Sequence, residues 1–226
     1  MTALVQVDVT DAWRRIKADG LSPTAFVMAC VGRAVAEHPE VHAYRDWWGR
    51  LVVHRHVDVA TMVEVDTKTG AFPLAHPIQD TDLRTVSDLS DELHRVRVNP
   101  ASGRSGKMLL RWGRQAARVP GLASLVYFVG RRSVLVRSGV GTVAVSSVGM
   151  MIGGSGFATS VPSIATISVL IGGATERPWV VDGEVVVRRI LDLSVQIDHR
   201  MVDGAPAARF GATLRRLLEN PDLVDW

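Results

Sequence analysis

Stretches in which apolar and polar residues alternate, or in which apolar residues run together, are spread along the whole chain. Alternation with a period of two predicts a strand with one buried face, and a short apolar run bounded by turn residues is typical of a buried strand. On this basis we expect strands in these segments: 4–10, 50–65, 71–78, 141–149, 164–174, 179–187 and 190–197. Residues 50–65 form either one long strand or two short ones. The Asp182–Gly183 pair predicts a hairpin turn within 179–187.

Other segments carry apolar residues every three or four positions, which is the spacing of one helix face. In the clearest of them, Ser22 can cap the helix, Pro23 suits its first turn and Pro39 ends it. Further helices are expected over 10–17, with Thr10 or Asp11 as the cap, over 84–98 and over 205–220. The mixed order of strands and helices predicts an α/β fold: a two-layer sandwich with a mixed sheet, in a single domain over residues 1–226.

The composition is that of an ordinary globular protein, with 47% hydrophobic and 22% charged residues. No apolar run reaches the roughly 18 residues of a transmembrane helix, and no signal-peptide pattern is visible, so a cytoplasmic location is expected. The single cysteine, Cys30, excludes an intrachain disulfide and lies in an apolar helical run, which favours a buried thiol. His54 and His56 have the spacing of two metal ligands on one strand face, but no third ligand is evident. We therefore expect both to be exposed strand residues and expect no metal site.

One segment has a strongly unequal charge. Residues 101–137 carry eight Arg and Lys residues and no Asp or Glu, although the formal net charge of the whole chain is only +3. The rest of the chain is therefore net acidic. Because no aromatic stacking pattern or binding motif accompanies the basic residues, a nucleic-acid partner is not expected.

A histidine stands where the last expected strand ends. The stretch SVQIDHRMVDG places His199 after that strand and Asp203 four residues later, at the start of the expected helix. Histidine has an ordinary pKa of about 6.5, which suits a general base near neutral pH. Asp203 can cap free N–H groups of the helix and anchor the loop. The spacing alone is equally consistent with a histidine that has no chemical role and with an Asp203 that is an ordinary helix cap.

The motif DHRMVDG resembles the D-H-R-x-x-D-G signature of the dihydrolipoyl acyltransferase components of 2-oxoacid dehydrogenase complexes. Chloramphenicol acetyltransferase, which shares their fold, has a related H-x-x-x-D-G motif. Four longer segments are also similar to that family: LSPTAFVMACVGRAVAEHPEVHAY, HVDVATMVEVDTKTGAFPLAHPIQDTDLRTVSDLSDEL, GTVAVSSVGM and LSVQIDHRMVDGAPAARFGATLRRLLENP. Together they cover most of residues 1–98 and 139–226.

The resemblance implies a chloramphenicol acetyltransferase-like fold and an acyltransferase. In such an enzyme His199 would be the general base, Ser146 would hydrogen-bond the tetrahedral oxyanion, and Asp203 would hold the loop without exchanging protons. The serine–histidine separation exceeds the family's usual one by about one residue, so Ser147 is the alternative to Ser146. In the family the histidine and the serine come from neighbouring subunits of a trimer. The resemblance therefore implies a homotrimer or a higher assembly.

The sequence departs from the family in three places. No lipoyl domain precedes the fold, so a stand-alone form is expected, with any lipoyl or acyl carrier group supplied by a separate protein. Residues 99–138 replace a much shorter segment. Within them, 104–132 can be an interfacial helix on anionic lipid, a lid or tunnel wall for CoA, or a helix packed on a neighbouring subunit. Finally, SSVGMMIGG replaces the family's S-N-L-G-M-F-G, which is expected to change acyl-group preference.

Two classes of function follow. The first is an acyltransferase that moves an acyl group from a thioester, of CoA or of a lipoyl group, to a thiol, amine or hydroxyl. It would act through a ternary complex, with His199 as base and with no metal or tightly bound cofactor. The second is a non-catalytic trimeric core or assembly subunit that retains the acyltransferase fold.

Overall fold

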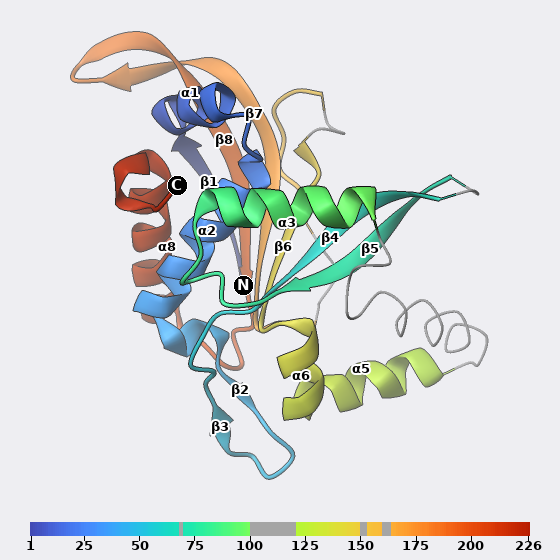
Figure 1. Ribbon diagram of the computed structural model, residues 1–226. Coiled ribbons are helices and arrows are strands. Elements are labelled where there is room, and N and C mark those ends of the chain that lie inside the picture. Colours follow the sequence, from blue (N-terminus) through green and yellow to red (C-terminus); the bar gives the residue numbers. More distant parts are fainter. Residues whose placement is uncertain (68–69, 100–120, 150–152, 160–163) are drawn as a thin grey trace.

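The computed structural model describes residues 1–67, 70–99, 121–149, 153–159 and 164–226. Within these residues a six-stranded sheet runs in the order β1-β8-β7-β6-β4-β5, and β2 and β3 form a separate small hairpin (Figure 1). The strands are β1 (Thr2–Asp8), β2 (Tyr44–Arg45), β3 (Leu51–Val52), β4 (Val59–Thr67), β5 (Gly70–Ile78), β6 (Val143–Ser147), β7 (Ile167–Val181) and β8 (Glu184–Ile197). Strand β6 is parallel to β4 and β7, whereas the other pairs are antiparallel, so the predicted mixed sheet is confirmed.

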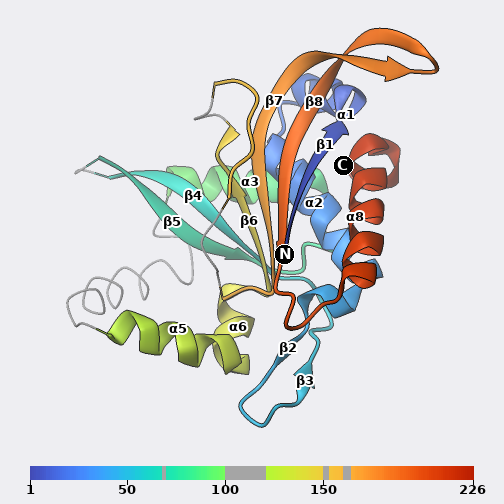
Figure 2. The ribbon, with the colours of Figure 1, turned by 180° about the vertical axis from the view of Figure 1, so that it is seen from behind.

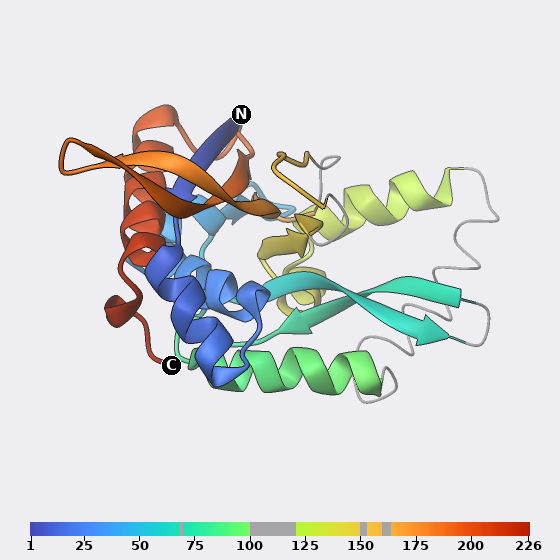
Figure 3. The same ribbon diagram turned by 90° about the horizontal axis from the view of Figure 1, so that it is seen from above.

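The helices divide into two groups (Figures 1 and 2). The helices are α1 (Thr10–Asp19), α2 (Pro23–Glu37), α3 (Val86–Val98), α5 (Leu122–Arg132), α6 (Val134–Val140) and α8 (Gly204–Glu219), with short 3-10 turns at Pro39–His42 and Pro221–Leu223. Helices α1, α2, α3 and α8 form the second layer of the sandwich, on one face of the sheet (Figures 1 and 3). Helices α5 and α6 lie beyond the end of the sheet, near the β2–β3 hairpin.

The core lies between the sheet and the four-helix layer. Helix α2 packs against both α3 and α8 and is apolar around most of its circumference, which is why ten of its residues are buried. Phe26 on α2 and Phe210 on α8 are almost fully buried, opposite alternate residues of the central strands such as Val145 and Val169. Cys30 is fully buried, and burial raises the pKa of its thiol, as the predicted structural role requires.

Most predicted elements occur at the expected positions, and some details differ. The expected strands 164–174, 179–187 and 190–197 form two continuous strands, β7 and β8. The segment 50–65 forms the second of its two expected alternatives, the strands β3 and β4, separated by residues 53–58. His54 and His56 lie in that connection rather than on a strand, so the prediction of exposed strand histidines is wrong. His54 hydrogen-bonds the hydroxyl of Tyr44 at 3.1 Å, and His56 lies 3.2 Å from the carboxylate of Asp82.

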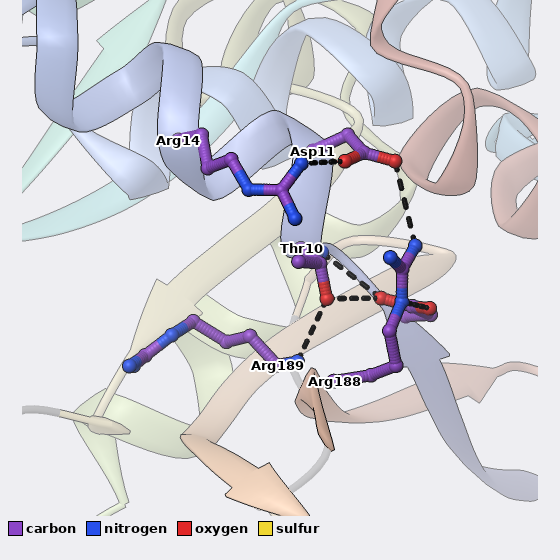
Figure 4. Close-up of polar contacts among 6 residues, drawn as sticks. Thr10, Asp11, Arg14, Arg188 and Arg189 are labelled. Carbon is purple, nitrogen blue, oxygen red and sulfur yellow. Dashed lines mark hydrogen bonds and ion pairs between the residues drawn. The ribbon is translucent and has the colours of Figure 1, made fainter. Parts of the chain in front are cut away.

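The start of α1 also differs from the prediction. Its cap position is Val9, so neither Thr10 nor Asp11 caps the helix. Instead the Thr10 hydroxyl donates a hydrogen bond to Asp8 at 2.6 Å and accepts one from the backbone N–H of Arg189 at 2.8 Å (Figure 4). The Arg188 guanidinium bridges the carboxylates of Asp8 and Asp11. These contacts attach the first turn of α1 to β8, and with it the helix layer to the sheet.

An ion pair attaches helix α3 to strand β5. The carboxylate of Glu92 on α3 accepts a hydrogen bond from His76 of β5 at 2.9 Å and another from Arg84. These two donors hold the pKa of Glu92 at about 2. A carboxyl whose pKa is lowered by folding stabilises the folded state above its ordinary pKa and loses that contribution as the pH falls toward the folded value.

Replacing Glu92 with glutamine is therefore expected to lower the free energy of unfolding at pH 7 by about 1–3 kcal/mol. The difference from the unmodified protein should shrink as the pH falls from about 5 to 2, because over this range the Glu92 carboxyl binds a proton more readily in the unfolded state than in the folded state. Urea unfolding at a series of pH values measures this difference. Exposed Glu184, at the β7–β8 turn, gives the matched control Glu184→Gln. A destabilisation by Glu92→Gln that does not change with pH would contradict the account.

Candidate active site

A one-turn loop connects the end of β8 to helix α8 and carries His199. The backbone N–H of Asp198 donates to the carbonyl of Thr166 at 2.9 Å, and the N–H groups of Met201 and Val202 donate back to the carbonyl of Asp198. The side chain of Val202 is buried in the main core. The loop is thus fixed at its start by the sheet and at its end by the core, which gives His199 a defined position.

The imidazole of His199 is held through one ring nitrogen. Nδ1 lies 2.9 Å from the carbonyl oxygen of Val202. A carbonyl oxygen can only accept a hydrogen bond, so Nδ1 carries the proton and Nε2 keeps its lone pair when the ring is neutral. The side chain is 59% exposed, so the imidazole is accessible from solvent. A positioned, accessible imidazole with a free acceptor nitrogen is what a general base requires.

Asp203 occupies the predicted place but makes a different contact. It is the cap residue of α8, yet its side chain makes no capping hydrogen bond, so the expected capping role is not seen. Its carboxylate is 90% exposed and lies 4.0 Å from Nδ1 of His199. The structure therefore brings Asp203 and His199 together, on the side of the ring that carries the proton.

The residues on either side of His199 form an ion-pair cluster. Asp198 accepts hydrogen bonds from the Arg200 guanidinium at 2.8 and 2.6 Å, and these hold the pKa of Asp198 below its ordinary value. Arg131 of helix α5 lies 3.7 Å from the same carboxylate. Helix α5 belongs to the segment 99–138, whose residues 100–120 lie outside the described part of the chain. The described part of this segment is thus attached to the histidine loop.

Arg137 provides a second attachment of this segment to the histidine loop, and this contact was not predicted. This residue of α6 is 96% buried; it donates to the Thr166 hydroxyl at 3.2 Å and lies over the ring of Tyr44 at 4.1 Å. Thr166 is the residue whose carbonyl holds the start of the histidine loop. Through its hydrogen bond to Thr166, the buried Arg137 therefore stabilises the start of that loop. In the sequence, only its position in the basic segment distinguishes Arg137.

The two candidate serines point to opposite faces of the sheet. Because strand side chains alternate, Ser147 shares the helix-facing side with buried Val143 and Val145, whereas Ser146 lies on the other side. Ser146 is half-buried there and pairs with Leu170, which in turn pairs with Ser194 of β8. Ser146 is thus open to the face that the helix layer does not cover.

Within one protomer Ser146 is distant from His199. Ser146 is level with Ser194 two strands away, and Ile197 lies three residues beyond Ser194. A rise of about 3.3 Å per residue and a strand spacing of about 4.8 Å place the Cα atoms of Ser146 and Ile197 about 14 Å apart. His199 is two residues further along the chain. The structure therefore does not bring Ser146 and His199 together in a single chain.

A cavity of about 370 Å³ lies between the sheet and helices α1 and α2. Its lining is mainly apolar, with Trp13, Phe26 and Leu191 among the lining residues, and Ser147 and Gly154 also border it. The cavity was not predicted, because its walls come from α1, α2, β6, β7 and β8, which are distant in the sequence. Ser147 faces this internal space, so the two serines have different surroundings.

The described residues contain no cluster of three or more His, Cys, Asp or Glu side chains that could hold a metal ion. None of their helices is long and apolar enough to cross a bilayer.

Comparison with known proteins agrees with the motif. Residues 138–224 match the profile of the 2-oxoacid dehydrogenases acyltransferase catalytic domain. The chain is 24% identical over 221 residues to the dihydrolipoyllysine-residue acetyltransferase component of the pyruvate dehydrogenase complex of Rickettsia prowazekii. The match covers 97% of this chain and 46% of that protein, so the chain spans about half the length of this relative.

Two solved structures show the fold. Azotobacter vinelandii dihydrolipoamide acetyltransferase superposes with a TM-score of 0.70 at 19% identity, covering 99% of this chain and 82% of that chain. A chloramphenicol acetyltransferase gives a TM-score of 0.59 at 18% identity, covering 96% and 87%. The resemblance expected from the sequence is confirmed. The chain has the chloramphenicol acetyltransferase-like fold, and its segment 138–224 is related to the catalytic domain of the 2-oxoacid dehydrogenase acyltransferases.

Proposed function

We propose that the protein is an acyltransferase that moves an acyl group from a thioester, of CoA or of a lipoyl group, to a thiol, amine or hydroxyl acceptor. The observation that carries this proposal is the hydrogen bond of His199 Nδ1 to the Val202 carbonyl, which leaves Nε2 as an accessible base. The relatives of the chain are named as acetyltransferases, and this supports the same class of reaction.

The reaction needs only these groups. Nε2 of His199 accepts the proton of the acceptor as its sulfur, nitrogen or oxygen bonds to the thioester carbonyl carbon. The carbonyl oxygen becomes an oxyanion, which the Ser146 hydroxyl stabilises by donating a hydrogen bond. The carbon–sulfur bond then breaks, and the proton on Nε2 passes to the leaving thiolate. The acyl group is transferred directly, so no covalent enzyme intermediate forms.

The proposal includes a homotrimer. Because Ser146 and His199 are far apart within one chain, a shared site requires the serine of one protomer to face the histidine of the next. Work on the Azotobacter enzyme concerns the catalytic role of a serine, a histidine and an asparagine, and the asparagine stands four positions after the histidine. Asp203 has the same separation from His199, which supports its role in positioning the imidazole.

We further propose that CoA thioesters are donors, that any lipoyl or acyl carrier group comes from a separate protein, and that the protein acts in the cytoplasm. No tightly bound cofactor and no metal takes part in the proposed steps. We also propose that residues 1–226 form a single catalytic domain, with a basic and apolar insertion at about 99–138.

A panel assay tests the function and separates it from the alternative of a non-catalytic core. Acyl-CoAs of increasing chain length are combined with dihydrolipoamide and with several amines. The free CoA that is released is measured with a CoA-specific assay. At least one pair is expected to give transfer above the background reaction. A folded oligomer that transfers no acyl group from any donor would favour a scaffold role.

A further inference from the structure

The tip of the β2–β3 hairpin exposes two adjacent tryptophans. Trp47 is 47% and Trp48 is 77% exposed, and Leu51 on β3 is exposed as well. The hairpin extends from the end of the molecule opposite the long β7–β8 ribbon (Figure 1). Side chains of this size usually lie within a protein or at a contact with something else.

Helix α5 presents a second apolar surface at the same end. Leu125, Phe128, Val129 and Arg132 occupy positions i, i+3, i+4 and i+7, so they form one stripe along the helix. The three apolar members of this stripe are exposed, with Leu125 at 57% and Phe128 at 50%. Gly130, on the opposite side of the helix, is buried near Ile164. Helix α5 thus packs on the protein through its glycine face and leaves its apolar stripe outside.

The hairpin and the helix form one continuous surface. The rings of Trp47 and Phe128 meet edge to face, with centroids 5.8 Å apart. The Arg132 guanidinium lies over the Phe128 ring at 4.7 Å and over the Trp47 ring at 5.8 Å. We call the exposed side chains of Trp47, Trp48, Leu51, Leu125, Phe128, Val129 and Arg132 the aromatic patch.

The surroundings of the aromatic patch are positively charged. Residues 43–54 and 121–140 contain five arginines and one acidic residue, Asp46. Arg137 is buried, and Arg50 and Arg131 pair with Asp46 and Asp198. The positive charge beside the patch therefore comes mainly from exposed Arg45 and Arg132. The Asp46 side chain is 1% exposed and accepts hydrogen bonds from Arg50 and from the backbone of Trp48, so it presents no negative charge outward.

We propose that the aromatic patch docks the protein on the surface of a lipid bilayer that contains anionic headgroups. Tryptophan favours the boundary between headgroups and acyl chains, where its ring is apolar and its N–H remains hydrated. Arginines around such residues add attraction to anionic lipid. The positive charge opposes the stacking of two such patches from two copies of the chain, whereas it complements an anionic membrane.

The docking places the membrane near the candidate active site. Arg131, on the same helix as the patch, pairs with Asp198 beside His199. The inference does not depend on the proposed function, because binding to vesicles is measured without any acyl substrate.

Flotation of the full-length protein with vesicles tests the proposal. Binding is expected to vesicles of phosphatidylcholine with phosphatidylglycerol, and to be much weaker to phosphatidylcholine alone or at high salt. The double variant Trp48→Ala with Phe128→Ala should lower the partition coefficient about tenfold or more, because two large apolar side chains are lost. Arg132→Gln should lower it about fivefold.

Val185→Ala with Val187→Ala is the matched control. These exposed residues of β8 lie on the ribbon at the opposite end of the molecule, and their loss should leave vesicle binding unchanged. Light scattering after size exclusion is run on every variant, and an unchanged oligomeric state is expected. Absence of binding to anionic vesicles would overturn the proposal. So would a double variant that binds vesicles normally but forms smaller oligomers, because the patch would then be an interface between copies.

Discussion

Replacing His199 with alanine is expected to lower kcat for acyl transfer by about 10²–10⁴-fold, the usual contribution of a positioned general base. The variant should fold normally, since the ring is more than half exposed and its one hydrogen bond joins it to its own loop. The substitution removes the proton acceptor at the position of Nε2, and Asp203 lies 4.0 Å from Nδ1, on the other side of the ring. Steady-state kinetics with the donor and acceptor found in the panel assay measure the loss.

The matched control is His94→Ala. His94 is an exposed histidine on α3, in the helix layer and away from the loop. Its replacement should leave kcat and the thermal unfolding temperature unchanged. A His199→Ala variant with turnover close to that of the unmodified protein would remove the assignment of His199 as base.

Replacing Ser146 with alanine is expected to lower kcat by about 10²–10³-fold with little change in KM, because an oxyanion donor acts mainly in the transition state. Ser146 is the preferred donor since it lies on the sheet face that the helices leave open. Ser147 instead faces the internal cavity beside α1 and α2. The comparison variant Ser147→Ala should therefore lose much less kcat.

A mixing experiment separates the role of Ser146 from a purely structural one. If serine and histidine come from neighbouring protomers, inactive Ser146→Ala and inactive His199→Ala chains refolded together should regain part of the activity. Each mixed oligomer would contain some sites with both residues intact. A larger kcat loss for Ser147→Ala than for Ser146→Ala would show that the serine assignment is wrong by one position.

The predictable part of this fold rests on local signals. Asp182 and Gly183 both adopt positive φ angles, as the predicted hairpin turn requires. Helix α2 spans Pro23–Glu37, with Ser22 at its cap position as predicted, although the Ser22 side chain makes no capping hydrogen bond. Periodicity also placed His199 directly after the last strand. These features depend on residues within a few positions of one another, so a single sequence contains them.

The features that were not predicted depend on residues distant in the sequence. His54 and His56 were expected to be exposed, but their partners Tyr44 and Asp82 are brought near by the fold. Which of Ser146 and Ser147 faces the helix layer depends on the strand register, and the buried position of Arg137 depends on the location of Thr166. The aromatic patch likewise joins a hairpin and a helix separated by more than seventy residues, and spacing within either one does not reveal it.

The most direct test of the central claim is CoA release measured with and without the acceptor. With the active acyl-CoA from the panel, free CoA should form only when the acceptor is present, without an initial burst, and this release should be lost in His199→Ala. CoA release that is equal in the unmodified protein and in His199→Ala, or a burst of CoA in the absence of acceptor, would contradict direct transfer with His199 as the base.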